Sequence, residues 1–351
     1  MRRTARPTAW IRTATLAVVA ALALFAPRVA AAAAPTTAPA GKLVLTILDI
    51  PDVQRGAGLA VILQLPSGKT CLYDTGAGYP DRAAPDGWVA GYNTGRDQIA
   101  PFLKARGVDK VDTVFMSHAH YDHFGGLVWL KDNVRIGRLV DSGFSFGAQS
   151  TPAYSGELGH YDKVRDEFRR RGAYLEAHTG DVIAVDPLLK VEVLAPPKEF
   201  FRQAYAETRA KNDPPAHYLV NANSLGMRIT YGKVTFLLPG DIQDVDQARS
   251  LVPSLPAGAL KCDVLVAPGH GLHAAKEFAE AARPQVALCS VFPRYAKGLP
   301  AHKVYAAVGA KVWVTGLHGQ LEVTCDGQTY EVKVEHPQGK PATRPATAPA
   351  R

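Results

Sequence analysis

The sequence SHAHYDHFGG occupies residues 117–126, directly after the apolar run DTVFM at residues 112–116. Such a run is typical of a buried strand, so the polar segment is expected at the carboxyl end of that strand. Three of the 11 histidines of the chain fall within six consecutive positions here, together with an aspartate. These side chains are His118, His120, Asp122 and His123. This density of ligand-type side chains favours a metal site over a solvated loop.

The spacing of the four side chains predicts two neighbouring metal positions. His118 and His120 are two residues apart at a strand end, where both rings can turn toward one ion. Asp122 and His123 lie beyond the bend and are predicted to serve a second ion. Imidazole nitrogens mixed with carboxylate oxygens favour zinc, with manganese or iron as alternatives. We therefore expect one or two ions, with zinc as the first candidate.

Strand-like and helix-like segments alternate on both sides of this motif. Before it, strands are expected at 43–50, 59–65 and 69–73, and a helix at 97–106. After it, a loop is expected at 142–160, a helix at 161–171, and two short strands within 182–194. Later strands are expected at 225–231, 233–238, 263–267, 286–291 and 311–315, with helices near 242–250, 273–282 and 302–308 and a closing hairpin at 320–325 and 328–334. This pattern predicts an α/β fold in which two mixed sheets are stacked between helical layers.

The H-x-H-x-D-H element at residues 118–123 resembles the signature of the metallo-β-lactamase superfamily. Members of that superfamily fold as an αββα sandwich of two mixed β-sheets flanked by helices, with one or two metal ions at the edge of the stacked sheets. The resemblance implies this fold for residues 42–336. It also implies a metal-dependent hydrolase that uses a metal-bound hydroxide.

Three other segments match the superfamily pattern, each just past an expected strand. Asp74 in YDTG would not touch metal but would orient a ligand or the motif loop. Asp241 in LLPGD resembles the carboxylate that bridges or approaches both ions, although an N-cap for the helix near 242–250 is the alternative. His270 in LVAPGHG resembles the last metal histidine, although a turn histidine is the alternative. The implied metal ligands are His118, His120, Asp122, His123, Asp241 and His270, with Asp122 and Asp241 also catalytic.

A narrower resemblance covers residues 43–334. The stretches LDIPDVQRGAGLAVILQLPSGKTCLYDTG, NANSLGMRITYGKVTFLLPGD and KCDVLVAPGHG are similar to the hydrolase domain of ComEC-type DNA-uptake proteins, as is KVWVTGLHGQLEV. Proteins of that type carry the domain beside a multispan membrane channel, and no segment after the N-terminus is apolar enough to span a membrane. The resemblance therefore implies a free-standing, exported relative.

Two departures from the ComEC-type pattern concern the site. That subfamily has His-His-Gly-Ser where this chain has Gly-His-Gly-Leu at residues 269–272, which bears on substrate contacts and on one ligand. In addition, the sequence between the motif and Asp241 contains no clear third histidine ligand for the first ion. His178 and His217 are the candidates by position, whereas an Asn-x-Asn-Ser element at residues 221–224 occupies that region.

The two ends of the chain differ in composition from its body. Residues 1–34 combine a basic start, an apolar run of about 13 residues and a row of small residues, which is the pattern of a secretory signal peptide. An uncleaved anchor is the alternative. Residues 35–41 are expected to form a flexible linker, and 337–351 a disordered Pro/Ala/Thr tail. These features predict a periplasmic or extracellular protein.

The net charge of +8 comes from these ends. Residues 1–34 hold five arginines and residues 338–351 hold three cations, with no acid in either segment, so the body is neutral. Bulk charge therefore neither indicates nor excludes a nucleic-acid partner. The four cysteines lie in apolar, strand-like stretches, which favours buried thiols over disulfides; they are Cys71, Cys262, Cys289 and Cys325.

The first functional hypothesis is an exported phosphodiesterase or nuclease. Phosphodiesters, nucleic acid among them, would then be the substrates. Possible substrate contacts are Asn223, His318, Arg294 and Lys297. The alternatives are a β-lactam or lactone hydrolase on the same site, and a non-enzymatic module with a degenerate metal site that binds a partner.

Overall fold

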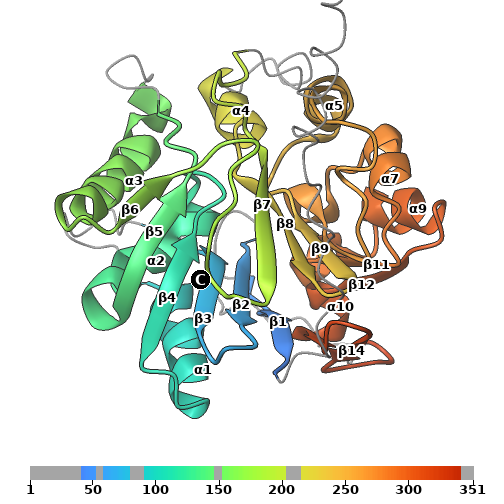
Figure 1. Ribbon diagram of the computed structural model, residues 1–351, viewed down its shortest axis with the longest axis horizontal. Coiled ribbons are helices and arrows are strands. Elements are labelled where there is room, and N and C mark those ends of the chain that lie inside the picture. Colours follow the sequence, from blue (N-terminus) through green and yellow to red (C-terminus); the bar gives the residue numbers. More distant parts are fainter. Residues whose placement is uncertain (1–40, 53–57, 80–90, 146–151, 203–214, 341–351) are drawn as a thin grey trace, which may run out of the picture. The chain divides into compact units, whose positions relative to one another are not determined.

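A computed structural model of the chain describes residues 41–52, 58–79, 91–145, 152–202 and 215–340 (Figure 1). All of these lie in one compact unit, residues 38–351. The predicted signal peptide and nearly all of the predicted linker lie outside the described residues, as do residues 341–351. No helix in the described part of the chain has the length and hydropathy that a bilayer span needs.

The strand before the histidine motif lies within an eight-stranded mixed sheet. In spatial order the strands are β14 (Tyr330–Val334), β13 (Leu321–Cys325), β1 (Leu43–Ile47), β2 (Ala60–Gln64), β3 (Thr70–Thr75), β4 (Lys110–Phe115), β5 (Arg135–Asp141) and β6 (Tyr174–Glu176). The strands from β14 to β3 pair antiparallel, whereas β3, β4, β5 and β6 pair parallel. The carboxyl ends of β3 and β4 therefore meet at the same edge of this sheet.

A second, six-stranded mixed sheet carries the later segments. Its strands in spatial order are β12 (Lys311–Val314), β11 (Val286–Cys289), β10 (Val264–Val266), β9 (Val234–Leu238), β8 (Gly226–Tyr231) and β7 (Leu189–Ala195). The four strands from β12 to β9 pair parallel, and β9, β8 and β7 pair antiparallel. The ends of β9, β10 and β11 thus also share one edge.

The two sheets pack face to face, and helices cover their outer faces. Leu45, Tyr73 and Phe115 of the first sheet and Met227 and Phe236 of the second belong to one buried cluster. Tyr73 in addition places its hydroxyl 2.7 Å from the carbonyl oxygen of Leu225, at the entry to β8.

The helices form the two outer layers. Against the first sheet lie α1 (Ala100–Ala105), α2 (Tyr121–Asn133) and α3 (Pro152–Arg170), and against the second lie α7 (Lys276–Ala282) and α9 (Pro300–Ala306) (Figure 1). The shorter helices are α4 (Pro215–Ala222), α5 (Asp244–Asp246), α6 (Val252–Ser254), α8 (Pro293–Ala296) and α10 (Thr315–His318). This arrangement confirms the predicted α/β fold with two mixed sheets flanked by helices.

Two segments differ from the structure assigned to them from the sequence, and α2, α4, α8, β5 and β6 lie where no element was predicted. Residues 142–160 were predicted as a loop, but α3 begins at Pro152, because proline suits the first turn of a helix and the later apolar residues share one face. Leu158, Tyr161 and Phe168 are all buried against the first sheet and α2. Within 182–194 there is a single strand, β7, and Val182 makes only an isolated bridge with Glu192.

The described C-terminal residues extend past the predicted end of the body at 336. Lys340 donates a hydrogen bond from Nζ to Asp49, 2.5 Å away, and one from its backbone N–H to the carbonyl of Leu317, 2.6 Å away. All four cysteines are buried free thiols, as the sequence favoured.

Candidate metal centre

Strand ends from both sheets bring the predicted ligands together. His118 and His120 follow β4, and Asp122 and His123 lie in the first turn of α2. Asp241 follows β9 and His270 follows β10, in a tight turn at Pro268–Gly271. The candidate centre therefore lies at the edge where the parallel strands of both sheets end.

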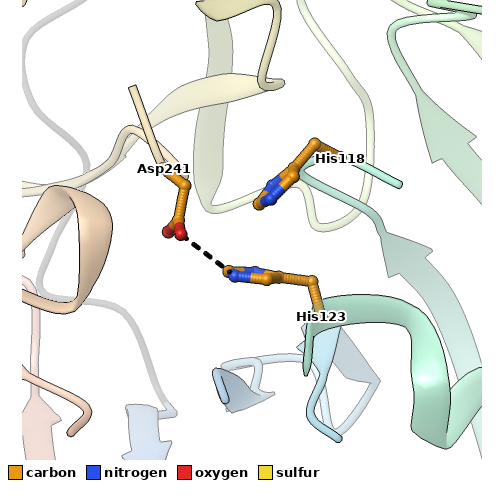
Figure 2. Close-up of side chains that lie close together, drawn as sticks. All are labelled: His118, His123 and Asp241. Atoms are coloured by element: carbon orange, nitrogen blue, oxygen red, sulfur yellow. Dashed lines mark ion pairs between the residues drawn. The ribbon is translucent and has the colours of Figure 1, made fainter. Parts of the chain in front are cut away.

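The ligand atoms of five of these residues lie close together. Within the described part of the chain, two groups have ligand atoms within 4.8 Å of one another: His118, His123 and Asp241, and Asp122, His123 and His270. Figure 2 shows the first group, with both rings and the carboxylate pointing toward one another.

Asp241 belongs to the first group and also contacts His270 of the second. Its Oδ2 atom is 3.3 Å from Nε2 of His123 and 3.1 Å from Nε2 of His270. Nε2 of His270 is also 3.6 Å from Oδ2 of Asp122. The two groups thus share one small polar volume rather than forming separate sites.

The Nδ1 atoms of His118, His123 and His270, which point away from the cluster, each contact a protein oxygen. Nδ1 of His123 lies 2.7 Å from Asp74, Nδ1 of His118 lies 2.8 Å from the hydroxyl of Ser117, and Nδ1 of His270 lies 3.0 Å from the carbonyl of Ser290. When these acceptors bind an Nδ1 proton, the Nε2 lone pair faces the cluster, which is the tautomer a metal ligand requires.

Asp74 connects two of the ligands. Besides His123, it accepts hydrogen bonds from the backbone N–H of Ser117, at 2.7 Å, and from the Ser117 hydroxyl, at 2.6 Å. Because that hydroxyl also contacts His118, one carboxylate is linked through hydrogen bonds to both rings. Asp74 occupies the position that an orienting, non-ligating residue would need, and this role stays a prediction.

Backbone strain concentrates at the site. Asp74 and His270 adopt positive φ angles of 57° and 61°. Gly240, which precedes Asp241, has a φ of 70°. A non-glycine residue rarely adopts this region, and strained residues persist where the surrounding structure holds them in place.

The charges of the cluster are strongly coupled. Burial lowers the pKa of His118 well below its ordinary value. Burial also opposes charge on His123, but the carboxylates of Asp241, Asp74 and Asp122 outweigh it and raise the pKa of His123 well above its ordinary value.

The remaining ligands follow the same balance. Burial disfavours the charged form of His270, yet Asp241 and Asp122 raise its pKa to about 9. Burial alone would raise the pKa of Asp122 and of Asp241. The neighbouring His123 and His270 lower it by a larger amount, so the pKa of both carboxyls lies below the ordinary value. Protons on imidazoles thus balance the carboxylate charge that a cation could balance instead.

The donor set fits a divalent metal ion. Imidazole nitrogens and carboxylate oxygens are zinc, iron and manganese ligands. Asp241 supplies a second indication, because its Oδ1 atom is buried and accepts no hydrogen bond within the described residues. A buried carboxylate oxygen without a partner is costly, and a cation would satisfy it.

His120 is placed differently from the other predicted ligands. Its Nδ1 atom lies 2.8 Å from Nε2 of His118, and the two rings meet edge to face. It belongs to neither ligand group found among the described residues. As a metal ligand His120 remains a prediction.

The candidates for a third histidine do not join the cluster in the described structure. His178 places Nε2 3.0 Å from Glu176 and packs its ring against Phe200. The side chain of His217 lies outside the described residues.

The predicted substrate contacts occupy several environments. Asn223 is buried and donates both amide hydrogens, to the carbonyls of Phe201 and Leu219, so it fixes the chain and has no hydrogen left for a substrate. His318 lies in α10, where its Nδ1 atom contacts the backbone of Val314.

Two predicted cations are more accessible than Asn223. The side chain of Arg294 is 51 % exposed and lies 3.1 Å from Asp52. Lys297 is also exposed.

Four residues at the site were not identified from the sequence as parts of it. Ser117 stands inside the motif, and its position next to His118 was the only available signal. Ser224 accepts a hydrogen bond from the backbone N–H of Asp241 at 3.2 Å, Ser290 holds His270, and Glu157 contacts the motif from α3. The last three come from segments far away in sequence.

Comparison with known proteins gives a family and several distant relatives. The family model described as Metallo-beta-lactamase superfamily matches residues 53–270. ComE operon protein 3 of Bacillus subtilis (strain 168) is 25% identical over 251 residues, which are 69% of this chain and 28% of that protein. The chain thus spans little more than a quarter of that relative, 28% of its length.

Two solved structures are distantly similar to the chain. CmlA, a diiron beta-hydroxylase from Streptomyces venezuelae, is 15% identical with a TM-score of 0.47, over 80% of this chain and 54% of that one. The metallo-beta-lactamase fold protein YhfI from Bacillus subtilis is 14% identical with a TM-score of 0.42, over 78% of this chain and 96% of that one.

Proposed function

Because the chain belongs to the metallo-beta-lactamase superfamily, we propose that it is an exported metal-dependent hydrolase whose substrates are phosphodiesters, single-stranded DNA among them. One observation carries the catalytic part. His118, Asp122, His123, Asp241 and His270 converge from the ends of strands in both sheets, with ligand atoms a few ångströms apart.

The side chains divide the work of hydrolysis among them. A divalent ion held by these ligands would supply Lewis acidity, which would make water nucleophilic near neutral pH. Asp74 and Ser290 hold the rings of His123 and His270 in a fixed direction. Oδ2 of Asp241 faces both rings, and its buried Oδ1, which accepts no hydrogen bond among the described residues, is the atom that would hold the ion.

The substrate class rests on sequence likeness. The ComEC-type stretches described above extend over most of the body, and ComE operon protein 3 is 25% identical over 251 residues. Arg294 and Lys297 are the exposed cations we assign to the substrate phosphates. Positive side chains near a developing phosphoryl charge stabilise the transition state.

The activity is tested with the full chain and added Zn²⁺ or Mn²⁺. We expect release of nitrophenol from bis(p-nitrophenyl) phosphate and cleavage of single-stranded DNA. Asp122→Asn should abolish both, whereas Asp132→Asn, at the exposed far end of the same helix, should retain both. Absence of turnover with either substrate would refute the phosphodiesterase proposal, and turnover of nitrocefin instead would identify a β-lactam hydrolase.

Export is tested separately, by fractionating cells that express the full chain with a C-terminal tag. The proposal requires the tagged protein outside the cytoplasm, with a new N-terminus near Ala34. A cytoplasmic protein that keeps Met1 would contradict it. The hydrolase proposal does not depend on this outcome.

A further inference from the structure

The N-terminus of α2 lacks a cap from its own segment. His120 occupies the N-cap position with extended dihedral angles, and its side chain makes no capping hydrogen bond. A helix leaves its first backbone N–H groups without intrahelical partners, and Ser, Thr, Asp or Asn at the N-cap normally satisfies one of them. Here that position holds an imidazole that lies against His118.

A carboxylate from another helix supplies the missing contact. The backbone N–H of Tyr121, the first residue of α2, donates a hydrogen bond to Oε1 of Glu157 in α3. Tyr121 stands between His120 and Asp122 in the sequence, so this bond holds the middle of the metal-binding motif.

A second contact from α3 reaches the same tyrosine. His160, one turn after Glu157, places Nδ1 3.1 Å from the Tyr121 hydroxyl. Residues three apart on a helix share a face, so α3 presents both side chains to the start of α2. Farther along, Glu167 lies 3.0 Å from Lys131, so the two helices are also tied at the other end of α2.

Glu157 lies close enough to Asp122 and His123 for their charges to shift the pKa of its carboxyl. Burial raises the pKa of its carboxyl to about 8, and the charge of Asp122 adds to that increase, whereas His123 opposes it. Glu157 itself belongs to neither ligand group among the described residues. It therefore acts on the centre through Tyr121 and not as a ligand.

We propose that Glu157 is a positioning residue of the metal centre: by holding the Tyr121 N–H, it fixes the first turn of α2 and thereby the directions of Asp122 and His123. This inference rests on the proposed metal centre. Loss of such an outer contact in a metal site typically weakens metal binding by about 10- to 100-fold.

The test measures Zn²⁺ affinity of the full chain by competition with a chromophoric chelator. We expect Glu157→Ala to weaken binding by about 10- to 100-fold. Glu157→Gln should stay within a few-fold of the wild type, because its amide oxygen can accept the same hydrogen bond. Glu167→Ala, the matched control on the same helix, should bind as the wild type does.

The outcomes separate this inference from the proposed function. A wild-type protein that binds no metal would refute the centre itself. Wild-type affinity in Glu157→Ala would overturn only the role of Glu157, and so would a Gln variant as weak as the Ala variant. If the Ala variant does not fold, Glu157→Asp provides the measurement, since its shorter side chain withdraws the carboxylate from Tyr121, and unchanged affinity there also overturns the proposal.

Discussion

At the scale of single residues, hydrogen bonds fix the directions of three imidazoles of the candidate centre. His118, His123 and His270 each have Nδ1 against a fixed acceptor, so their rings cannot rotate freely. Preorganised ligands lose little conformational entropy on binding, which is how a metal site gains affinity from its surroundings. Mutations that remove these hydrogen bonds should therefore change metal affinity, as mutations of the ligands should.

Asp74→Asn should weaken metal binding by about 10- to 100-fold. Asp74 accepts three hydrogen bonds, two from Ser117 and one from His123. An amide NH₂ facing Nδ1 of His123 would force the proton onto Nε2, the atom a metal needs. Equilibrium dialysis with Zn²⁺ measures the change.

The control for this variant is Asp112→Asn. Asp112 also accepts a cross-strand N–H, from Thr70 at 3.1 Å, but it lies near the opposite end of β4. It should bind metal as the wild type does. Equal affinity in both variants would show that Asp74 does not orient the ligands.

Metal binding should release about one to two protons at pH 7. The pKa of His270 is about 9 and that of His123 lies well above its ordinary value, so both rings carry a proton that a metal ion must displace. Below these pKa values protons compete with the metal, so affinity rises with pH through the His270 pKa of about 9. Calorimetry in buffers of different ionisation enthalpy measures the number released.

His178→Ala is the matched control, because that histidine lies outside the ligand groups of the described residues. It should release as many protons as the wild type, and His270→Ala about one fewer. A binding enthalpy that is the same in every buffer would contradict the predicted protonation.

Five of the predicted ligand residues lie close together in the structure, and their role as ligands stays a prediction, whereas most of the side chains that contact them were not predicted. The predicted ligands His118, Asp122, His123, Asp241 and His270 all follow apolar runs. Such runs can be recognised in the sequence. The contacts of Ser290 and Glu157 depend on how segments far apart in sequence pack together. Nothing in the local pattern around either residue marks such a contact.

At the scale of elements, the turns that follow the strands set the positions of the ligands. Gly240 ends β9 with a φ of 70°, and a Cβ there would lie 2.6 Å from Cβ of Ser224 and 3.1 Å from Cβ of Ser117. Only glycine lets this turn pass so close to both serines, and the next residue is Asp241.

Gly240→Ala should therefore destabilise the protein and weaken metal binding together. The left-handed conformation alone costs roughly 1–2 kcal/mol, and the clash adds to it. Gly258→Ala is the control, because Gly258 has a φ of 83° with no atom within 4 Å of the added carbon. Urea unfolding and Zn²⁺ titration of both variants check this. Wild-type metal affinity in Gly240→Ala would show that the turn does not position Asp241.

Three of the elements that the sequence analysis did not identify are short or polar, namely β5, β6 and the first half of α3. β5 is exposed or half-buried over its first four residues, and β6 is only three residues long, so neither presents a long apolar run. The first half of α3 is rich in polar residues and glycine, which have low helix propensity. Packing of its buried residues against α2 outweighs that propensity, and a local pattern cannot reveal it.

At the scale of the whole body, the centre joins the two sheets. Asp122 and His123 follow a strand of the first sheet, whereas Asp241 and His270 follow strands of the second. A cation bound by both sets adds a cross-link between the sheets that the unfolded chain cannot form.

Metal should therefore raise the melting temperature, and a chelator should lower it. Binding only to the folded state adds about 4 kcal/mol when the free metal is 1,000 times its dissociation constant. Thermal melts with Zn²⁺ and with EDTA measure the difference. Asp132→Asn should keep this shift and Asp122→Asn should lose most of it. Identical melts of the wild type in both conditions would exclude tight binding to the native state.

The separation of the ligands along the chain also fixes when the centre can form during synthesis. His123 and His270 are 147 residues apart. At about 5–20 residues per second, a ribosome needs roughly 7–30 s to make that interval. A metal centre that uses both histidines could therefore form only after His270 has been made.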